Sequence, residues 1–203
     1  MVTLFPLFLR LEGRRCLLVG AGNIAAQKIQ SLLSAGAVVH VVAPMAGSLL
    51  RKLIREGQVC WSQRAFRSSD LDGAVLVIAA TGDPVINETV FREARRRGIL
   101  CNAVDEPERC DFYYPALVQR GDLQIAISTA GRSPALAQRI RKELETQFSQ
   151  DYAEWLSWLG DVRTRLFRRS MDPERRRRAL HRVASAEFYT RFIAPRREKA
   201  GQR

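Results

Sequence analysis

The amino-acid sequence predicts an α/β fold: a Rossmann-type, doubly wound parallel sheet, followed by a small hairpin-plus-helix region and a C-terminal helical domain. Three observations predict it. Short apolar runs alternate with helical patterns over the first hundred residues, which favours a parallel sheet with right-handed crossovers. A glycine-rich turn joins the first buried run to the first helix. Beyond residue 112 the alternation stops, and two extended runs are followed by helical patterns alone.

The chain opens on the apolar segment Phe5–Leu9. It has no basic leader and no small-residue cleavage site, so it predicts a first strand or edge segment rather than a signal peptide. The run Cys16–Val19 is fully apolar and ends at a glycine, which is typical of a buried parallel strand. A helix is predicted over Asn23–Ser34, with Gly36 placed to end it in a left-handed conformation.

The next elements follow the same alternation. The β-branched run Val38–Val42 predicts a second strand, and a helix through Leu49–Ile54 ends at Gly57. Val59–Trp61 predicts a third strand. The run Ala74–Ala80 is the most apolar of the chain, so we expect it at the centre of the sheet.

Asp83 and Pro84 predict the start of another helix, with the carboxylate as cap and the proline in the first turn. That helix runs to Arg97, and Ile99–Asn102 predicts a further strand. This strand completes the alternation on which the parallel sheet is predicted.

The second half of the chain has a different pattern. Tyr113–Gln119 and Leu123–Ser128 are extended runs that predict a hairpin. Ser133 begins a helix, Tyr152–Ile193 has helical spacing, and Pro195–Arg203 is predicted to be a frayed tail.

These patterns predict a Rossmann-type domain at residues 1–112, a hairpin-plus-helix region at 113–149 and a helical domain at 150–203. No run of about 18 apolar residues occurs, so no membrane partner is expected. The four cysteines contain no CxxC pair, and Cys16 and Cys101 lie in buried-strand patterns, which suits reduced thiols in the cytoplasm. With two histidines, no metal site is expected.

The formal net charge is +12, and residues 151–203 carry 14 Lys and Arg against 7 Asp and Glu. The run Arg175–Arg178 has no interleaved aromatic residues and no recognisable nucleic-acid module around it. We therefore expect no nucleic-acid partner. A basic surface of this kind also attracts small polycarboxylates.

The turn Gly20-Ala21-Gly22-Asn23-Ile24-Ala25 carries the strongest local signal for a cofactor. It follows a predicted strand and opens a predicted helix, which is the context of a dinucleotide-binding turn. Gly20 permits the tight turn, Gly22 lets the backbone touch a pyrophosphate, and Ala25 allows close helix–strand packing. The alternative is a glycine turn that only packs tightly.

The choice of dinucleotide stays open on physical grounds. The end of the second strand reads Val42-Ala43-Pro44-Met45, without the acid that usually binds the ribose of NAD. No arginine stands there for the 2′-phosphate of NADP, so backbone around Pro44 and Met45 is expected to hold the ribose.

Ligands of a doubly wound sheet bind beyond the carboxyl ends of its strands. Thr81 and the segment Asn102–Asp105 both arrive there, beside the glycine turn. Thr81 is therefore an expected cofactor contact, and Asp105 could exchange protons near the nicotinamide. A loop or capping aspartate is an equally good interpretation of Asp105 from position alone.

Several segments together resemble a known family: Phe5–Leu9, Gly20–Lys28, Val41–Pro44, Ala79–Thr81, Asn102–Asp105 and Ile127–Ala137. On these motifs the chain resembles the precorrin-2 dehydrogenase and sirohydrochlorin ferrochelatase family, which is also found as the amino-terminal part of the siroheme synthases. The resemblance covers about residues 5–150. The segment around Ser133 and Pro134 is more specific than the glycine turn.

The resemblance implies NAD-dependent oxidation of precorrin-2 to sirohydrochlorin in siroheme biosynthesis. By position, Asn23 and Ile24 would contact NAD at the glycine turn, and Pro44 and Met45 would contact it after the second strand. Asp105 matches the family's catalytic aspartate and would accept a proton from the macrocycle. No methyltransferase domain follows in the sequence, which implies a stand-alone dehydrogenase.

The family also implies a homodimer formed through residues 113–149. Thr129 matches a serine that is phosphorylated in some relatives, and the threonine leaves that regulation open. Two rival functions remain at this point. The chain could insert Fe²⁺ or Co²⁺ into sirohydrochlorin, with or without the dehydrogenase activity, or it could be a non-catalytic NAD-sensing or nucleic-acid-binding module.

Overall fold

The computed structural model describes residues 3–200, without the side chains of Asn23 and of residues 195–200. The described chain divides into two compact units, one formed by Thr3–Tyr114 and one that begins at Pro115. The further division into regions 113–149 and 150–203 stays a prediction.

The first unit is built on a five-stranded sheet in which every strand is parallel to its neighbours. The strand order is β3-β2-β1-β4-β5, so the direction of winding reverses between β1 and β4. This confirms the doubly wound sheet. The strands are β1 (Arg15–Val19), β2 (Val38–Val42), β3 (Val59–Ser62), β4 (Leu76–Ala79) and β5 (Leu100–Ala103).

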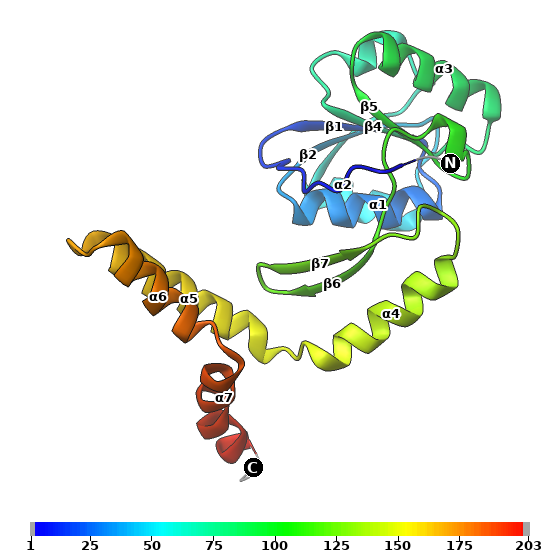
Figure 1. Cartoon of the computed structure of the whole chain (residues 1–203). Helices are drawn as coiled ribbons and strands as arrows, with labels where there is room; N and C mark the ends of the chain where they lie inside the picture. Colours follow the sequence, from blue (N-terminus) through cyan, green and yellow to red (C-terminus); the bar gives the residue numbers. More distant parts are fainter. Residues whose placement is uncertain (1–2, 201–203) are drawn as a thin grey trace. The chain divides into compact units, whose positions relative to one another are not determined.

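Helices cover both faces of this sheet (Figure 1). The helices α1 (Asn23–Ser34) and α2 (Ser48–Arg55) pack on one face, and α3 (Pro84–Arg96) packs on the other. Alternate residues of β1 therefore enter different cores: Leu18 faces α1, and Leu17 faces α3. Burial on both faces explains why the strands read as continuous apolar runs.

The register of the strands sets the position of the loops that follow them. Val19 pairs with both Val42 and Ala79, and Ala79 pairs with Ala103. Four strands thus end at one level, and the chain leaves the sheet there at Gly20, Ala43, Ala80 and Val104. The carboxyl edge of the sheet gathers the predicted site loops.

The prediction of a strand near Phe5–Leu9 was wrong. Residues 3–11 form no strand, and the side chains of Phe5 and Phe8 are 83% and 69% exposed. The strands β1, β2 and β4 each already have two neighbours, and the outer edge of β5 is partly occupied by a bridge between Asn102 and Cys110. Pro6 also lacks the backbone N–H that strand pairing uses.

The second unit begins with the antiparallel hairpin of β6 (Ala116–Arg120) and β7 (Leu123–Ile127), as predicted. Four helices follow in the described part of this unit. Ser133 caps the first of them by accepting a hydrogen bond from the Leu136 backbone N–H at 3.2 Å. The helices are α4 (Pro134–Gln147), α5 (Asp151–Arg168), α6 (Pro173–Val183) and α7 (Ala186–Ala200).

The helices α5 and α7 share an aromatic cluster. The Tyr152 and Tyr189 rings lie 4.4 Å apart, and Trp155 packs on both.

The prediction of a frayed tail from Pro195 was wrong as far as Ala200, because α7 continues through the proline. Proline removes one helical hydrogen bond without ending this helix. Residues 201–203 lie outside the described part. Between residues 3 and 200, no helix combines the length and apolar character needed to cross a bilayer.

Candidate active site

The glycine turn and the loop after β4 are in direct backbone contact. Gly20 has φ +102°, which L side chains rarely adopt, and a Cβ atom there would lie 2.2 Å from the Ala80 carbonyl oxygen. The Ala80 N–H donates to the Val19 carbonyl at 2.8 Å, which fixes that loop. Gly20 is therefore required both for its backbone conformation and for the close approach of two loops.

The amino end of α1 is open toward solvent. Gly22 is the N-cap, and in the part of the chain described here no side chain caps this helix. A Cβ atom at Gly22 would meet nothing within 4 Å. By contrast, Asp83 caps α3, with its carboxylate accepting from the Val85 N–H at 2.9 Å. The free N–H groups of α1 therefore fit an anion such as a dinucleotide pyrophosphate.

Enlarging Gly22 tests this arrangement. Its φ of −73° is open to any residue, so Gly22→Val is expected to leave the protein folded. The added methyl groups would fill the space above the helix and raise the dissociation constant for a dinucleotide about tenfold or more. Calorimetric titration measures the affinity, and circular dichroism checks the fold. An unchanged affinity in a folded variant would contradict this role for the turn.

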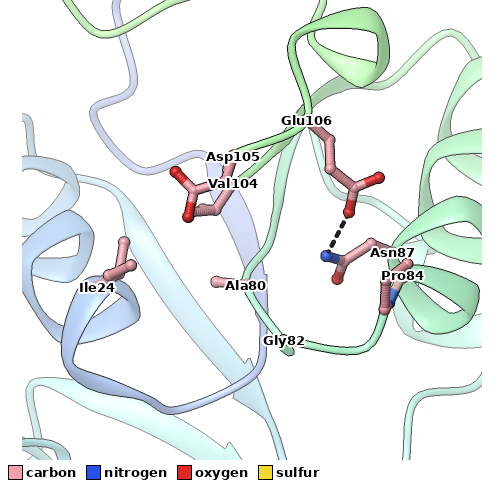
Figure 2. A pocket seen from close by; sticks show the side chains of 8 residues that line it. All are labelled: Ile24, Ala80, Gly82, Pro84, Asn87, Val104, Asp105 and Glu106. Carbon is pink, nitrogen blue, oxygen red and sulfur yellow. Dashed lines mark hydrogen bonds between the residues drawn. The ribbon is translucent and has the colours of Figure 1, made fainter.

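A pocket of about 440 Å³, the first pocket, lies beside the glycine turn (Figure 2). Its size is in the range of small-molecule sites. It combines the start of α1 with the loops after β4 and β5, and is lined by Ile24, Ala80, Gly82, Pro84, Asn87, Val104, Asp105 and Glu106. The structure thus brings together the predicted residues Ile24 and Asp105, with Thr81 between two lining residues.

Asp105 and Glu106 point in opposite directions (Figure 2). Asp105 has φ 62°, a left-handed conformation that aspartate tolerates better than most residues. Its side chain is exposed at the pocket, and no hydrogen bond to it occurs among the described residues. Glu106 instead turns toward α3 and accepts a hydrogen bond from Asn87 Nδ2 at 2.9 Å. Asp105 is thus the carboxylate left free to meet a ligand.

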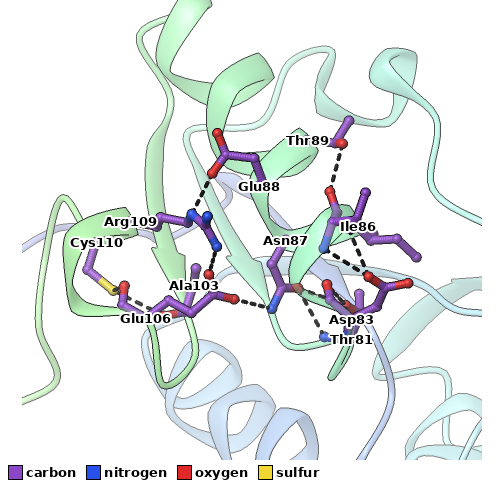
Figure 3. Close-up of polar contacts among 11 residues, drawn as sticks. Thr81, Asp83, Ile86, Asn87, Glu88, Thr89, Ala103, Glu106, Arg109 and Cys110 are labelled. Carbon is purple, nitrogen blue, oxygen red and sulfur yellow. Dashed lines mark hydrogen bonds and ion pairs between the residues drawn. The ribbon is translucent and has the colours of Figure 1, made fainter.

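Asn87 links the loops after β4 and β5 (Figure 3). It is 3% exposed, and its Oδ1 accepts from Thr81 Oγ1 at 2.7 Å and from the Thr81 N–H at 3.3 Å. Beyond it, Arg109 pairs with Glu106 and with Glu88, where Nε and Oε2 are 2.5 Å apart. This chain of contacts joins the loop after β4, which contains Thr81, to the loop after β5, which carries Asp105.

Removing the Asn87 side chain is expected to destabilise the protein. Asn87→Ala leaves the Thr81 N–H without its side-chain acceptor, removes the shorter of two hydrogen bonds that the Thr81 hydroxyl donates, and deprives Glu106 of a donor. The free energy of unfolding should fall by about 2 kcal/mol. Thr89→Ala is the control, because it removes one exposed hydrogen bond from the same helix. Urea unfolding measures both, and equal losses would show that the linkage is unimportant.

A second pocket of about 260 Å³ shares Ile24, Val104, Asp105 and Glu106 with the first. Lys28 lines it, with Nζ 3.6 Å from the centre of the Tyr114 ring. Burial lowers the pKa of Lys28, and the negative charge of Asp105 opposes that shift. Asp105 therefore stands between the two pockets, with a half-buried cation on one side.

Pro44 and Met45 lie after β2 and line neither pocket, and Met45 is 79% exposed. The loop they form is anchored instead by Trp61 Nε1, which donates to the Ala43 carbonyl at 3.0 Å. Arg51 Nε donates to the Ala46 carbonyl at 2.9 Å. The fold thus brings an arginine to the loop where the local sequence offers none.

Two of the cysteines, Cys16 and Cys101, are buried in the strands of the sheet. Burial raises the pKa of Cys16 to about 11 and that of Cys101 to about 12, so both thiols stay protonated at neutral pH. Within residues 3–200, no group of three or more His, Cys, Asp and Glu side chains is arranged to hold a metal ion.

Sequence reasoning did not single out Lys28, Asn87 or Glu106 as site residues. Asn87 lies in a helical pattern, where a polar residue normally faces solvent, and it is 19 positions from Glu106. A polar residue that turns inward only after folding leaves no local signal. For Asn23, the backbone begins α1, and its side chain is outside the described part.

Two family models match the chain. The family described as "Putative NAD(P)-binding" matches residues 7–116, more than half of the chain. The family described as "Sirohaem biosynthesis protein central" matches residues 120–147. The two matches correspond to the sheet with its flanking helices and to the region from the hairpin to α4.

Two similar full-length proteins are siroheme synthases. The siroheme synthase of Photorhabdus laumondii is 39% identical over 183 residues, covering 90% of this chain and 39% of that protein. The siroheme synthase of Azotobacter vinelandii is 38% identical over 195 residues, covering 96% and 42%. The chain thus spans about two fifths of the length of these relatives.

A solved structure of similar length also matches. It is titled SirC, precorrin-2 dehydrogenase, and superposes with a TM-score of 0.81 at 27% identity, covering 92% of both chains. Together with the match to the NAD(P)-binding family, this similarity extends over both units. The chain therefore belongs to the precorrin-2 dehydrogenase family, and it is similar to about two fifths of the length of the siroheme synthases.

Proposed function

We propose that this chain oxidises precorrin-2 to sirohydrochlorin with NAD⁺ as the electron acceptor. The single observation that carries the proposal is the exposed carboxylate of Asp105 at the first pocket, beside the open amino end of α1. This is where a reacting carbon and a dinucleotide would have to meet. The family relationship supplies the reaction, and the positions of these groups support it.

The residues proposed to hold the cofactor lie along the carboxyl edge of the sheet. They are Gly20, Gly22, Asn23, Ile24, Pro44, Met45 and Thr81. When bound, the nicotinamide ring supplies a hydride acceptor. The choice of NAD over NADP rests on the family resemblance, because Arg51 beside the β2 loop could also face a 2′-phosphate.

Asp105 is proposed as the proton acceptor. Oxidation of the macrocycle removes a hydride, with its two electrons, and one proton. The hydride leaves to NAD⁺, and the proton passes to the Asp105 carboxylate, which releases it to solvent. An exposed carboxylate with no hydrogen-bonding partner among residues 3–200 suits this role, because both of its oxygens are free.

The proposal is tested by incubating the protein anaerobically with precorrin-2 and following sirohydrochlorin by its absorbance. Formation that requires NAD⁺ and is weak with NADP⁺ is the expected result. Equal rates with and without a dinucleotide would contradict it. Faster formation with NADP⁺ than with NAD⁺ would support the proposed reaction but identify NADP⁺ as its electron acceptor.

A second activity, insertion of ferrous iron into sirohydrochlorin, is proposed for the same site. The supporting observation is again the free Asp105 carboxylate, which could receive the pyrrole protons that the entering iron, a substrate here, displaces. Formation of siroheme from sirohydrochlorin and Fe²⁺, or of cobalt-sirohydrochlorin from sirohydrochlorin and Co²⁺, without NAD⁺ tests this activity separately. No formation above the uncatalysed rate would leave a dehydrogenase alone.

We also propose a cytoplasmic homodimer formed through residues 113–149. Leu117 on β6 and Leu136 on α4 are each 39% exposed, which suits association through this region. Sedimentation equilibrium of the wild type and a Leu117→Glu, Leu136→Glu double variant tests the proposal. A monomeric wild type would contradict it.

A further inference from the structure

We propose that the second pocket is a subsite for a carboxylate side arm of the tetrapyrrole substrate, with the Lys28 ammonium as its counter-ion. This inference rests on the proposed function and adds a binding residue to it. The family resemblance assigns no role to Lys28.

The size of the second pocket suits an arm and not a macrocycle. At about 260 Å³ it is smaller than the pockets that usually hold a whole small-molecule ligand. It shares Ile24, Val104, Asp105 and Glu106 with the first pocket. A substrate whose ring edge reaches Asp105 from the first pocket could therefore place a side arm in the second.

The charged residues that line the second pocket favour a negatively charged side arm of the substrate. Lys28 is the one cation among the residues that line the two pockets in the described part of the chain. It forms no ion pair within 4 Å there, and its ammonium stands over the face of Tyr114. A half-buried ammonium that has an aromatic ring but no carboxylate beside it is a site for an anion.

The two acidic residues of the lining leave room for such an anion. Arg109 and Asn87 already engage Glu106. Asp105 faces the ammonium from beyond ion-pairing distance, close enough to oppose the lowering of the Lys28 pKa. Lys28 would therefore also screen Asp105 from the repulsion of the substrate's own carboxylates.

Neighbouring groups suit an arm that ends in a carboxylate. Burial keeps the pKa of Tyr114 far above its ordinary value, so its phenol stays neutral and adds no repulsion. Tyr113 is held by its hydroxyl, which donates to the Pro107 carbonyl at 3.2 Å. Tyr114 thus gives the wall beside Lys28 a neutral, aromatic face.

The experiment measures binding without turnover. Sirohydrochlorin, the product, is titrated anaerobically into wild type, Lys28→Met and Lys28→Arg, and its absorbance reports the dissociation constant. Lys28→Met keeps a long apolar stem and is expected to weaken binding about tenfold. Lys28→Arg keeps the charge and should stay within about threefold of wild type.

Two controls make the result specific. Lys52→Met removes the same charge from α2, where Lys52 Nζ lies 3.8 Å from Glu56 Oε1. This change should not alter the affinity for sirohydrochlorin. Added KCl should weaken wild-type binding more steeply than binding by Lys28→Met. NAD⁺ affinity should be the same in all four proteins, because Lys28 lies in the second turn of α1, away from its amino end.

Unchanged sirohydrochlorin affinity in Lys28→Met would overturn the subsite, whether or not turnover is affected. Loss of NAD⁺ affinity in its place would assign Lys28 to the cofactor and also overturn it. These failures differ from failure of the proposed function. A wild type that binds sirohydrochlorin through Lys28 but does not oxidise precorrin-2 would refute the proposed reaction and retain the subsite.

Discussion

Replacing Asp105 by asparagine is expected to lower the rate of precorrin-2 oxidation at least about a hundredfold and to leave NAD⁺ affinity unchanged. The amide has nearly the shape of the carboxylate but cannot accept the proton. Asparagine is the right replacement because residue 105 has φ 62°, and asparagine tolerates this left-handed conformation almost as well as aspartate does. Alanine would add backbone strain to the loss of the carboxylate.

The matched control is Glu108→Gln, which removes one negative charge from an exposed position in the same loop. It should oxidise precorrin-2 at the wild-type rate. Single-turnover measurements with saturating NAD⁺ compare the three proteins. Retained oxidation by Asp105→Asn would remove this residue from the mechanism. Equal losses in both variants would indicate a general effect of charge and not proton transfer.

Gly20→Ala is expected to reduce the free energy of unfolding by at least about 3 kcal/mol, or to prevent folding. The added Cβ would lie 2.2 Å from the carbonyl oxygen of Ala80 and 2.6 Å from the carbonyl carbon of Ala80. Both are backbone atoms. The loop after β4 cannot move away freely, because the Ala80 N–H is bonded to Val19 in β1. The φ of +102° adds to the cost.

Gly13→Ala separates the two causes of that loss. Gly13 also has a positive φ, +68°, but a Cβ there would meet nothing within 4 Å. Gly13→Ala should lower the free energy of unfolding by about 1 kcal/mol, which is the cost of a positive φ for alanine. Urea denaturation of both variants gives the comparison. If Gly20→Ala loses no more than Gly13→Ala, the close approach to Ala80 is not what requires glycine.

The elements that the sequence predicted well are those with strong local signals. The helix α1 was predicted over Asn23–Ser34 and has these bounds, because a glycine turn precedes it and Gly36, at φ 73°, follows it. Asp83 caps α3 as predicted. Such signals depend on residues within one helical turn of each other, so they are legible before the chain folds.

Predictions failed where the outcome depends on partners distant in the chain. The apolar segment Phe5–Leu9 resembles a strand locally, but the interior strands already have neighbours on both sides. For Pro195, the local preference to end a helix did not end α7. In both cases the competing contacts come from other elements, which a local pattern does not contain.

For the site, the sequence alone identified the glycine turn and placed Asp105 at the carboxyl edge of the sheet. These follow from the order of strands and helices, because parallel strands must all end on one side. Tertiary structure decided what surrounds Asp105. Lys28 meets Tyr114 across 86 positions, and Asn87 meets Glu106 across 19. Periodicity fixes which elements form, whereas side-chain direction and packing decide which of their residues touch.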